Sequence, residues 1–167
     1  MNKPNDVTLK SVVPEGKLPS TNYWSEDHFK DELEYVFRRG WLNVCRADQL
    51  PNPGDFFVKD LYALGVSALI VRGQDGQIRA FYNMCSHRGN KVACDREGNR
   101  KGFQCLFHGW VYDTEGKLVS VPEKEKFEFL DMEQESLRPI NMDIWGGFVH
   151  ICLDDNPPSP CRNSCSR

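Results

Sequence analysis

Two short segments that each contain one cysteine and one histidine constrain this chain most. The first is Cys85-Ser86-His87 and the second is Cys105-Leu106-Phe107-His108, so the pattern is C-x-H-x17-C-x2-H. Thiolate sulfur and neutral imidazole nitrogen are ligands that transition metals prefer. A glycine follows each segment and allows the chain to turn tightly, at Gly89 and at Gly109. The sequence therefore predicts that these two cysteines and two histidines are metal ligands.

Two kinds of metal centre fit four such ligands. A structural zinc ion accepts two thiolates and two imidazoles, but zinc modules usually pair cysteine with cysteine and histidine with histidine. Here each segment contains one ligand of each type. A two-iron cluster of the Rieske type takes two cysteines on one iron and two histidines on the other. The mixed pairs favour a [2Fe-2S] cluster, with a tetrahedral zinc site as the alternative.

Longer runs around the two segments are similar to a known family. They are Arg38-Arg39-Gly40-Trp41, Cys85 to Gly89, Cys105 to Trp110, and Trp145-Gly146-Gly147-Phe148. These runs resemble the N-terminal part of the large (alpha) subunit of Rieske-type aromatic ring-hydroxylating oxygenases. The resemblance implies a Rieske [2Fe-2S] cluster on Cys85, His87, Cys105 and His108. It also implies a ferredoxin or reductase as electron donor, and a catalytic domain or another oxygenase subunit as acceptor.

One part of that family has no counterpart in this chain. The large subunits continue into a catalytic domain in which two histidines and a carboxylate bind a single iron(II) ion. Only His28 and His150 remain here for such a site, and they fall in different predicted elements. We therefore expect this chain alone to be inactive as an oxygenase. We interpret it as a truncated or frameshifted large subunit, and the alternative is a free-standing Rieske ferredoxin-like electron carrier.

The resemblance also bears on the reduction potential. Rieske proteins of high potential have an additional cysteine in each ligand loop, and the two form a disulfide over the cluster. The corresponding positions here are Asn90 and Phe107, and Ser86 is the only obvious hydroxyl donor. We therefore expect a potential at the low end of the Rieske range.

Composition favours one domain without nucleic-acid or membrane partners. The 167 residues, 40% hydrophobic and 27% charged, are enough for one ordinary core. The net charge of −3 provides no basic surface for nucleic acid, and the longest nearly apolar run, 61–71, is too short to span a bilayer. The first twenty residues are unlike a secretion signal. We expect a cytoplasmic protein in which the cysteines that bind no metal are reduced thiols.

The predicted fold is mainly β: an antiparallel Rieske-type β domain with a short N-terminal helix. Strands are expected at 41–45, 56–61, 67–72, 77–84, 103–105, 110–112, 137–140 and 147–151 because these runs are rich in β-branched and aromatic residues. Turns are expected at 73–76 and 113–116. Cys45 and Cys152 lie in apolar runs and are expected in the core. Trp110 is expected to pack behind its loop, and Cys94 is expected not to be a ligand.

The expected helix runs from Ser25, its N-cap, to about Arg39, and Gly40 ends it. Its apolar residues share one face that we expect to pack into the core: Phe29, Leu33, Val36 and Phe37. The expected divisions of the chain are a flexible arm at 1–22, this helix and the following strand at 23–44, the Rieske domain at 45–155, and a disordered tail at 156–167.

Overall fold

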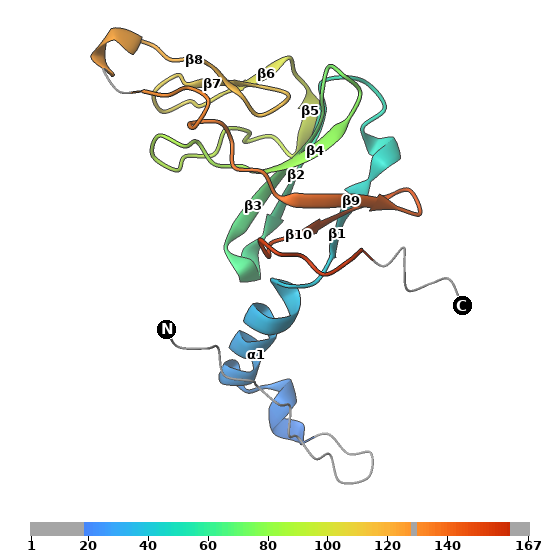
Figure 1. Ribbon diagram of the computed structural model, residues 1–167. Coiled ribbons are helices and arrows are strands. Elements are labelled where there is room, and N and C mark those ends of the chain that lie inside the picture. The colour runs from blue at the N-terminus through green and yellow to red at the C-terminus, as the bar shows by residue number, and fades with distance from the viewer. Residues whose placement is uncertain (1–18, 128–129, 161–167) are drawn as a thin grey trace.

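The computed structural model describes residues 19–127 and 130–160. Within them, three antiparallel sheets account for most of the regular structure, and one α-helix precedes them (Figure 1). The predicted fold class is therefore confirmed. The predicted arm and tail lie largely outside the described residues, and the four chain divisions remain predictions. No helix in the described ranges is long and apolar enough to cross a membrane.

The strands belong to sheets of the order β1-β10-β9, β4-β3-β2-β5 and β6-β7-β8. The bounds of the elements are α1 Glu26–Glu32, β1 Leu42–Arg46, β2 Asp55–Leu61, β3 Val66–Arg72, β4 Ile78–Tyr82, β5 Glu97–Asn99, β6 Gly102–Gln104, β7 Val111–Asp113, β8 Leu118–Ser120, β9 Asn141–Trp145 and β10 Phe148–Cys152. All pairs within these sheets are antiparallel.

The predicted hairpin between β3 and β4 is confirmed. These strands pair from Arg72 opposite Ile78 to Ala68 opposite Tyr82. In the turn between them, the N–H of Gly73 donates to the carbonyl oxygen of Gln77 at 2.8 Å. Gly76 has a φ of 80°, a conformation in which a side chain is strained. The glycines at 73 and 76 therefore predicted this turn correctly.

One predicted strand, 137–140, is wrong. A single bridge joins Pro139 to Phe81 there, and proline has no N–H group with which to extend the ladder. Conversely, β5, β8 and β9 were not predicted. The short polar β5 forms because it pairs with the edge of β2, where Asn99 lies opposite Asp55 and donates a side-chain hydrogen bond to it at 2.7 Å. Pairing with a neighbour outweighed the weak strand preference of its residues.

The expected helix begins where predicted. The Oγ atom of Ser25 accepts a hydrogen bond from the N–H of His28 at 3.3 Å, which is the geometry of an N-cap. After α1 the chain continues as a π-helical turn at Leu33–Phe37. The N–H of Gly40 then bonds to the carbonyl oxygen of Val36, and the helical segment ends.

The expectation that the apolar helix face packs into the core is wrong. Phe29, Val36 and Phe37 are 48%, 58% and 40% exposed. Figure 1 shows that α1 projects away from the sheets. Its apolar residues border a groove with the short segment 61–64, which covers only part of the face. The sequence pattern indicated an apolar face, but the sheets do not enclose it.

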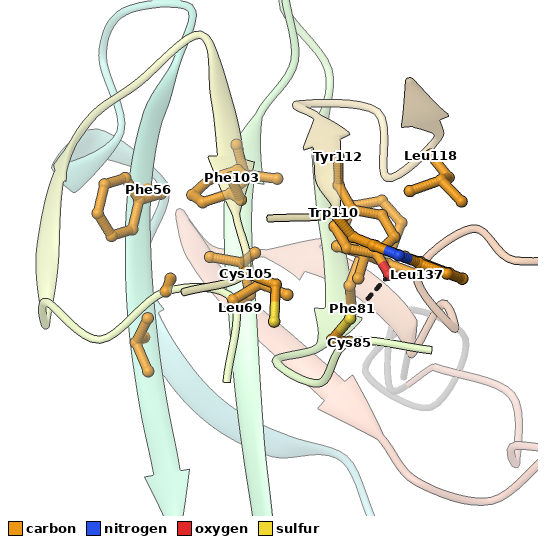
Figure 2. Packing of buried hydrophobic residues seen from close by; sticks show 14 of the residues in the cluster. Phe56, Leu69, Phe81, Cys85, Phe103, Cys105, Trp110, Tyr112, Leu118 and Leu137 are labelled. Atoms are coloured by element: carbon orange, nitrogen blue, oxygen red, sulfur yellow. Dashed lines mark hydrogen bonds between the residues drawn. The ribbon is translucent and has the colours of Figure 1, made fainter. Parts of the chain in front are cut away.

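Two hydrophobic clusters fill the interior. One lies between β10 and the four-stranded sheet and includes Val44, Cys45, Ile70, Val149 and Ile151. The other contains Phe56, Leu69, Phe81, Cys85, Val92, Phe103, Cys105, Trp110, Tyr112, Leu118 and Leu137 among its members (Figure 2). Cys45 and Cys152 are buried as predicted. The five cysteines in the described ranges are free thiols.

Candidate metal centre

The first predicted ligand segment forms a tight loop directly after β4. The N–H of Cys85 donates to the carbonyl oxygen of Asn90 at 2.8 Å, and the N–H of Gly89 donates to the carbonyl oxygen of Cys85 at 2.9 Å. Gly89 has a φ of 74°. A left-handed residue is therefore required for the chain to close this loop around the cysteine.

The second segment forms a loop of the same shape between β6 and β7. The N–H of Cys105 donates to the carbonyl oxygen of Trp110 at 2.8 Å, and the N–H of Gly109 donates to the carbonyl oxygen of Cys105 at 2.9 Å. Gly109 has a φ of 76°. The two similar segments thus adopt the same backbone conformation and the same pattern of backbone hydrogen bonds.

The loops separate the two kinds of predicted ligand by depth. Cys85 and Cys105 are each 2% exposed and belong to the same core cluster (Figure 2). His87 is half-buried and His108 is exposed, and their ring centroids are 4.6 Å apart. Two buried thiols therefore lie beneath a pair of neighbouring imidazoles at the loop tips.

One atom of this group has no hydrogen-bond partner among the residues that the structure describes. The Nδ1 atom of His87 is buried and unpaired. A buried polar atom without a partner costs about 1–3 kcal/mol. A metal ion that accepts the lone pair of a neutral imidazole would satisfy this atom. The arrangement therefore fits a metal-bound group at this position.

The pKa values of these side chains respond to burial and to one another. Burial lowers the pKa of His87, and the neighbouring His108 and Arg88 lower it further. This favours the neutral imidazole, which is the form that binds metals. Burial also raises the pKa of the Cys85 thiol, against the opposing effect of its contact with Tyr112.

Cys105 differs from Cys85 in its backbone surroundings. Burial has the largest single effect and acts to raise its pKa, but hydrogen bonds from the backbone of Phe107 and of His108, together with those from the Cys85 and Asn90 side chains, lower the pKa overall. The Nδ2 atom of Asn90 also lies 3.8 Å from the Sγ atom of Cys105. The second loop is therefore the one that better stabilises a thiolate.

A hydroxyl group from β7 contacts the first loop. The phenolic oxygen of Tyr112 lies 3.2 Å from the Sγ atom of Cys85, and Figure 2 draws this contact as a dashed line. The same oxygen accepts the N–H of Ser86 at 3.1 Å. The expectation of Ser86 as the only obvious hydroxyl donor is thus incomplete, because no local sequence pattern indicates that Tyr112 reaches the other loop.

Aromatic side chains fix the orientation of His87. Its ring stacks on Trp110, with centroids 4.8 Å apart and an angle of 8° between the planes. Phe127 meets both rings edge to face, at 6.0 Å from His87 and 5.9 Å from Trp110. Trp110 is 3% exposed, so it packs behind the loop as predicted.

A buried asparagine holds the chain that leaves the first loop. The Oδ1 atom of Asn83 accepts the N–H groups of Val92 and Ala93 at 3.2 and 2.9 Å, and its Nδ2 atom donates to the carbonyl oxygen of Ala93 at 2.7 Å. Sequence reasoning missed this role. A single asparagine two residues before a cysteine carries no signal of it.

The other predicted candidates lie elsewhere. His28 is on α1, where it is 3.6 Å from the carboxylate of Glu32, and His150 is on β10. Cys94 is exposed in the segment between the loops. Within the described ranges, no three or more histidine, cysteine, aspartate or glutamate side chains are grouped as one metal ion would need. A [2Fe-2S] cluster requires two protein ligands on each iron, and the loops offer two pairs.

The sequence also matches a family of cluster-binding domains. The profile of the Rieske [2Fe-2S] domain matches residues 40–138. The chain is 38% identical over 156 residues to the large oxygenase component of a naphthalene 1,2-dioxygenase system from Pseudomonas aeruginosa. The aligned region covers 90% of this chain and 34% of that protein. It is 35% identical over 157 residues to the alpha subunit of biphenyl 2,3-dioxygenase from Rhodococcus jostii (strain RHA1). That alignment covers 92% of this chain and 34% of the subunit.

Solved structures show the same architecture. A quaternary ammonium Rieske monooxygenase superposes with a TM-score of 0.79 at 30% identity, over 85% of this chain and 39% of the other. Naphthalene 1,2-dioxygenase with bound indole superposes with a TM-score of 0.74 at 34% identity, over 81% of this chain and 31% of the other. The chain therefore spans about a third of the length of the curated relatives it matches.

Proposed function

The chain belongs to the Rieske [2Fe-2S] domain family, and on this basis we propose that it is the electron-transfer part of an oxygenase large subunit. The cofactor of the family is a Rieske-type [2Fe-2S] cluster, which replaces the zinc alternative. We assign the two buried thiolates, Cys85 and Cys105, to one iron, and the two imidazoles, His87 and His108, to the other.

The observation that carries this assignment is the unpaired Nδ1 atom of His87. It is buried, its ring is fixed against Trp110, and the ring of His108 lies beside it. No group in the described ranges forms a hydrogen bond with this atom. Coordination to iron would give it a partner, and a [2Fe-2S] cluster requires two imidazoles close together.

The residues around the site suit electron transfer. When bound, such a cluster accepts and releases single electrons. Burial of Cys85 and Cys105 keeps water away from the sulfur ligands. His108, by contrast, remains at the surface. Leu106 and Phe107 are 79% and 60% exposed beside it, and this apolar rim suits a protein partner.

The partners follow from the same family. We propose that a ferredoxin or reductase donates electrons and that the acceptor is a catalytic domain or another oxygenase subunit. The related proteins are components of such oxygenases. Their similarity covers α1 as well as the cluster loops, and this extent favours an oxygenase subunit over a free-standing ferredoxin-like carrier. The chain lacks a second site with two histidines and a carboxylate in its described ranges, and we propose that by itself it does not oxygenate a substrate.

Metal analysis and single substitutions test the assignment. Protein purified anaerobically from iron-replete cells should contain iron and acid-labile sulfide in equal amounts. Cys85→Ala and His108→Ala should remove the visible chromophore, whereas Cys94→Ala and His28→Ala should retain it. One zinc ion per chain without sulfide would contradict the proposal.

A further inference from the structure

The segment between the two ligand loops differs in charge from the rest of the chain. Residues 88–101 contain five basic and two acidic side chains, a net charge of +3, whereas the whole chain has a net charge of −3. Six of these seven residues are exposed, and Arg100 is partly buried. A local charge opposite in sign to the net charge attracts partners that the rest of the surface repels.

Part of this segment forms one wall of a groove at the edge of β2. β5 pairs only with the first part of β2, residues 55–57. Beyond them, the edge of β2 borders a groove of about 330 Å3. Its lining side chains include Lys59, Asp60, Tyr62, Lys91 and Arg96. Tyr62 is 86% exposed, and tyrosine and arginine are enriched where proteins contact one another.

The charges in this groove do not cancel. The Nζ atom of Lys91 lies 2.8 Å from the Oδ1 atom of Asp60, so these two form a neutral pair. Within the described ranges, neither Lys59 nor Arg96 forms an ion pair. The guanidinium group of Arg96 instead lies over the ring of Phe57, 5.6 Å from its centroid. The described lining therefore carries two positive charges that no carboxylate offsets.

The groove adjoins the first ligand loop. Lys91 directly follows Asn90, whose carbonyl oxygen accepts the N–H of Cys85 at 2.8 Å. The Nδ2 atom of Asn90 also lies 3.8 Å from the Sγ atom of Cys105. One wall of the groove is thus a single residue away from the group that closes the loop around the buried thiols. A protein bound in the groove comes close to the proposed cluster ligands.

We propose that this groove is the docking site of an acidic electron-donor protein, a ferredoxin or reductase with carboxylates on its contact surface. Complementary charges steer two proteins together and fix their relative orientation. Lys59 and Arg96 supply the unbalanced positive charge, and Tyr62 supplies an exposed aromatic contact. The identity of the partner rests on the proposed function, whereas the binding itself is measured without any electron transfer.

Binding of a negatively charged plant-type ferredoxin to the cluster-containing protein tests the site. Calorimetry should detect a complex at an ionic strength of about 10 mM, where the screening length is about 30 Å. At about 150 mM the screening length falls to about 8 Å, and the affinity should fall several-fold. No complex at the lower ionic strength would overturn the proposal. A short DNA duplex that binds more tightly than the ferredoxin would overturn it as well, because the groove would then suit nucleic acid.

Paired variants separate the groove from the overall charge. Lys59→Gln combined with Arg96→Gln should weaken the binding of ferredoxin about three- to ten-fold. Lys117→Gln combined with Arg138→Gln changes the net charge equally. Arg138 lies over the ring of Tyr82 on β4, at the opposite edge of the sheet, so this control should keep the affinity within about two-fold. Equal losses in both variants would overturn the proposal, because net charge alone would then explain the attraction.

Cross-linking locates the contact. A carbodiimide joins a lysine amine to a neighbouring carboxylate as an amide, with loss of water. Mass spectrometry should find ferredoxin peptides attached at Lys59 or Lys91 and none at Lys117, and the reverse pattern would overturn the site. Ferredoxin that binds in the groove without reducing the cluster would support the site and count against the proposed function. Reduction that does not depend on Lys59 and Arg96 would support the proposed function and overturn the site.

Discussion

The phenolic oxygen of Tyr112 and the Sγ atom of Cys85 are 3.2 Å apart and join the two ligand loops. Ser86 uses its hydroxyl proton in a 2.7 Å hydrogen bond to the carbonyl oxygen of Glu135, and its N–H already donates to Tyr112. A cysteine thiolate has no proton to donate. When Cys85 is a thiolate, Tyr112 is therefore the donor of any hydrogen bond between them, and the Oγ atom of Ser86, 2.9 Å from the same phenolic oxygen, is the other acceptor of that proton. Burial and the Cys85 contact both raise the pKa of Tyr112, which keeps its proton in place.

We predict that Tyr112→Phe lowers the reduction potential of the cluster. A hydrogen bond to sulfur stabilises the more negative, reduced state more than the oxidised state. If that difference is about 1 kcal/mol, the midpoint falls by about 40 mV. Redox titration followed by paramagnetic resonance measures it. Tyr62→Phe, at an 86% exposed tyrosine, should leave the midpoint unchanged. A potential that stays the same in Tyr112→Phe would show that this contact does not act on the cluster.

The midpoint potential of the unmodified protein should lie near the low end of the Rieske range, at about −150 mV. Positions 90 and 107 hold asparagine and phenylalanine, so no cysteine pair can cover the cluster. Tyr112 adds one hydroxyl donor that the sequence had not indicated, while the Ser86 hydroxyl donates to a carbonyl oxygen. A midpoint well above zero in an optical redox titration would refute this prediction.

Asn83→Ala should destabilise the fold by about 2–4 kcal/mol, because it leaves the N–H groups of Val92 and Ala93 and a carbonyl oxygen buried without their partner. Urea unfolding monitored by circular dichroism measures the free energy of unfolding. Gln74→Ala, at an exposed turn position, is the control and should change it by less than about 0.5 kcal/mol. A similarly small effect of Asn83→Ala would mean that water replaces the lost hydrogen bonds.

The buried thiol of Cys45 should make stability depend on pH in the alkaline range. Burial raises its pKa from 9.0 to about 11. The unfolded chain therefore loses this proton at a lower pH than the folded chain does. The resulting stabilisation is complete below about pH 9 and is lost as the pH rises to about 11.

We expect the difference in unfolding free energy between the unmodified protein and Cys45→Ala to shrink as the pH rises from 8 to 11. Urea unfolding at several pH values measures it. Cys94→Ala changes an exposed thiol and should show no such trend. If the difference in unfolding free energy between the unmodified protein and Cys45→Ala stayed constant over this pH range, the Cys45 thiol would have the same pKa in the folded and unfolded chain.

The chain alone should transfer electrons without oxygenating a substrate. The test supplies a compatible reductase, NADH, oxygen and panels of aromatic and quaternary-amine compounds, with catalase present and full-length subunits excluded. Cluster reduction and reoxidation without product is the expected result. Substrate-dependent oxygenated product would show that the chain contains a catalytic site that we have not recognised.

The sequence predicted the chemistry of the site better than it predicted the packing around it. The spacing of Cys85, His87, Cys105 and His108 favoured a two-iron cluster over zinc, and the family match supports that cofactor. The glycines at 89 and 109 indicated tight turns, and both have positive φ. Such features are local, because ligand type, spacing and turn residues act over a few neighbouring positions.

Only the tertiary structure decided which distant residues meet. The Tyr112 hydroxyl reaches Cys85 because β7 carries it beneath the first loop, and Asn83 is buried because the chain folds back at Val92. The helix face at Phe29 has the periodicity of a core helix, yet it stays exposed because no sheet encloses it. Likewise, Lys59 and Lys91 line one groove only because the chain after the first ligand loop lies against the edge of β2. Burial and long-range pairing depend on how all elements assemble, and short sequence patterns do not encode that assembly.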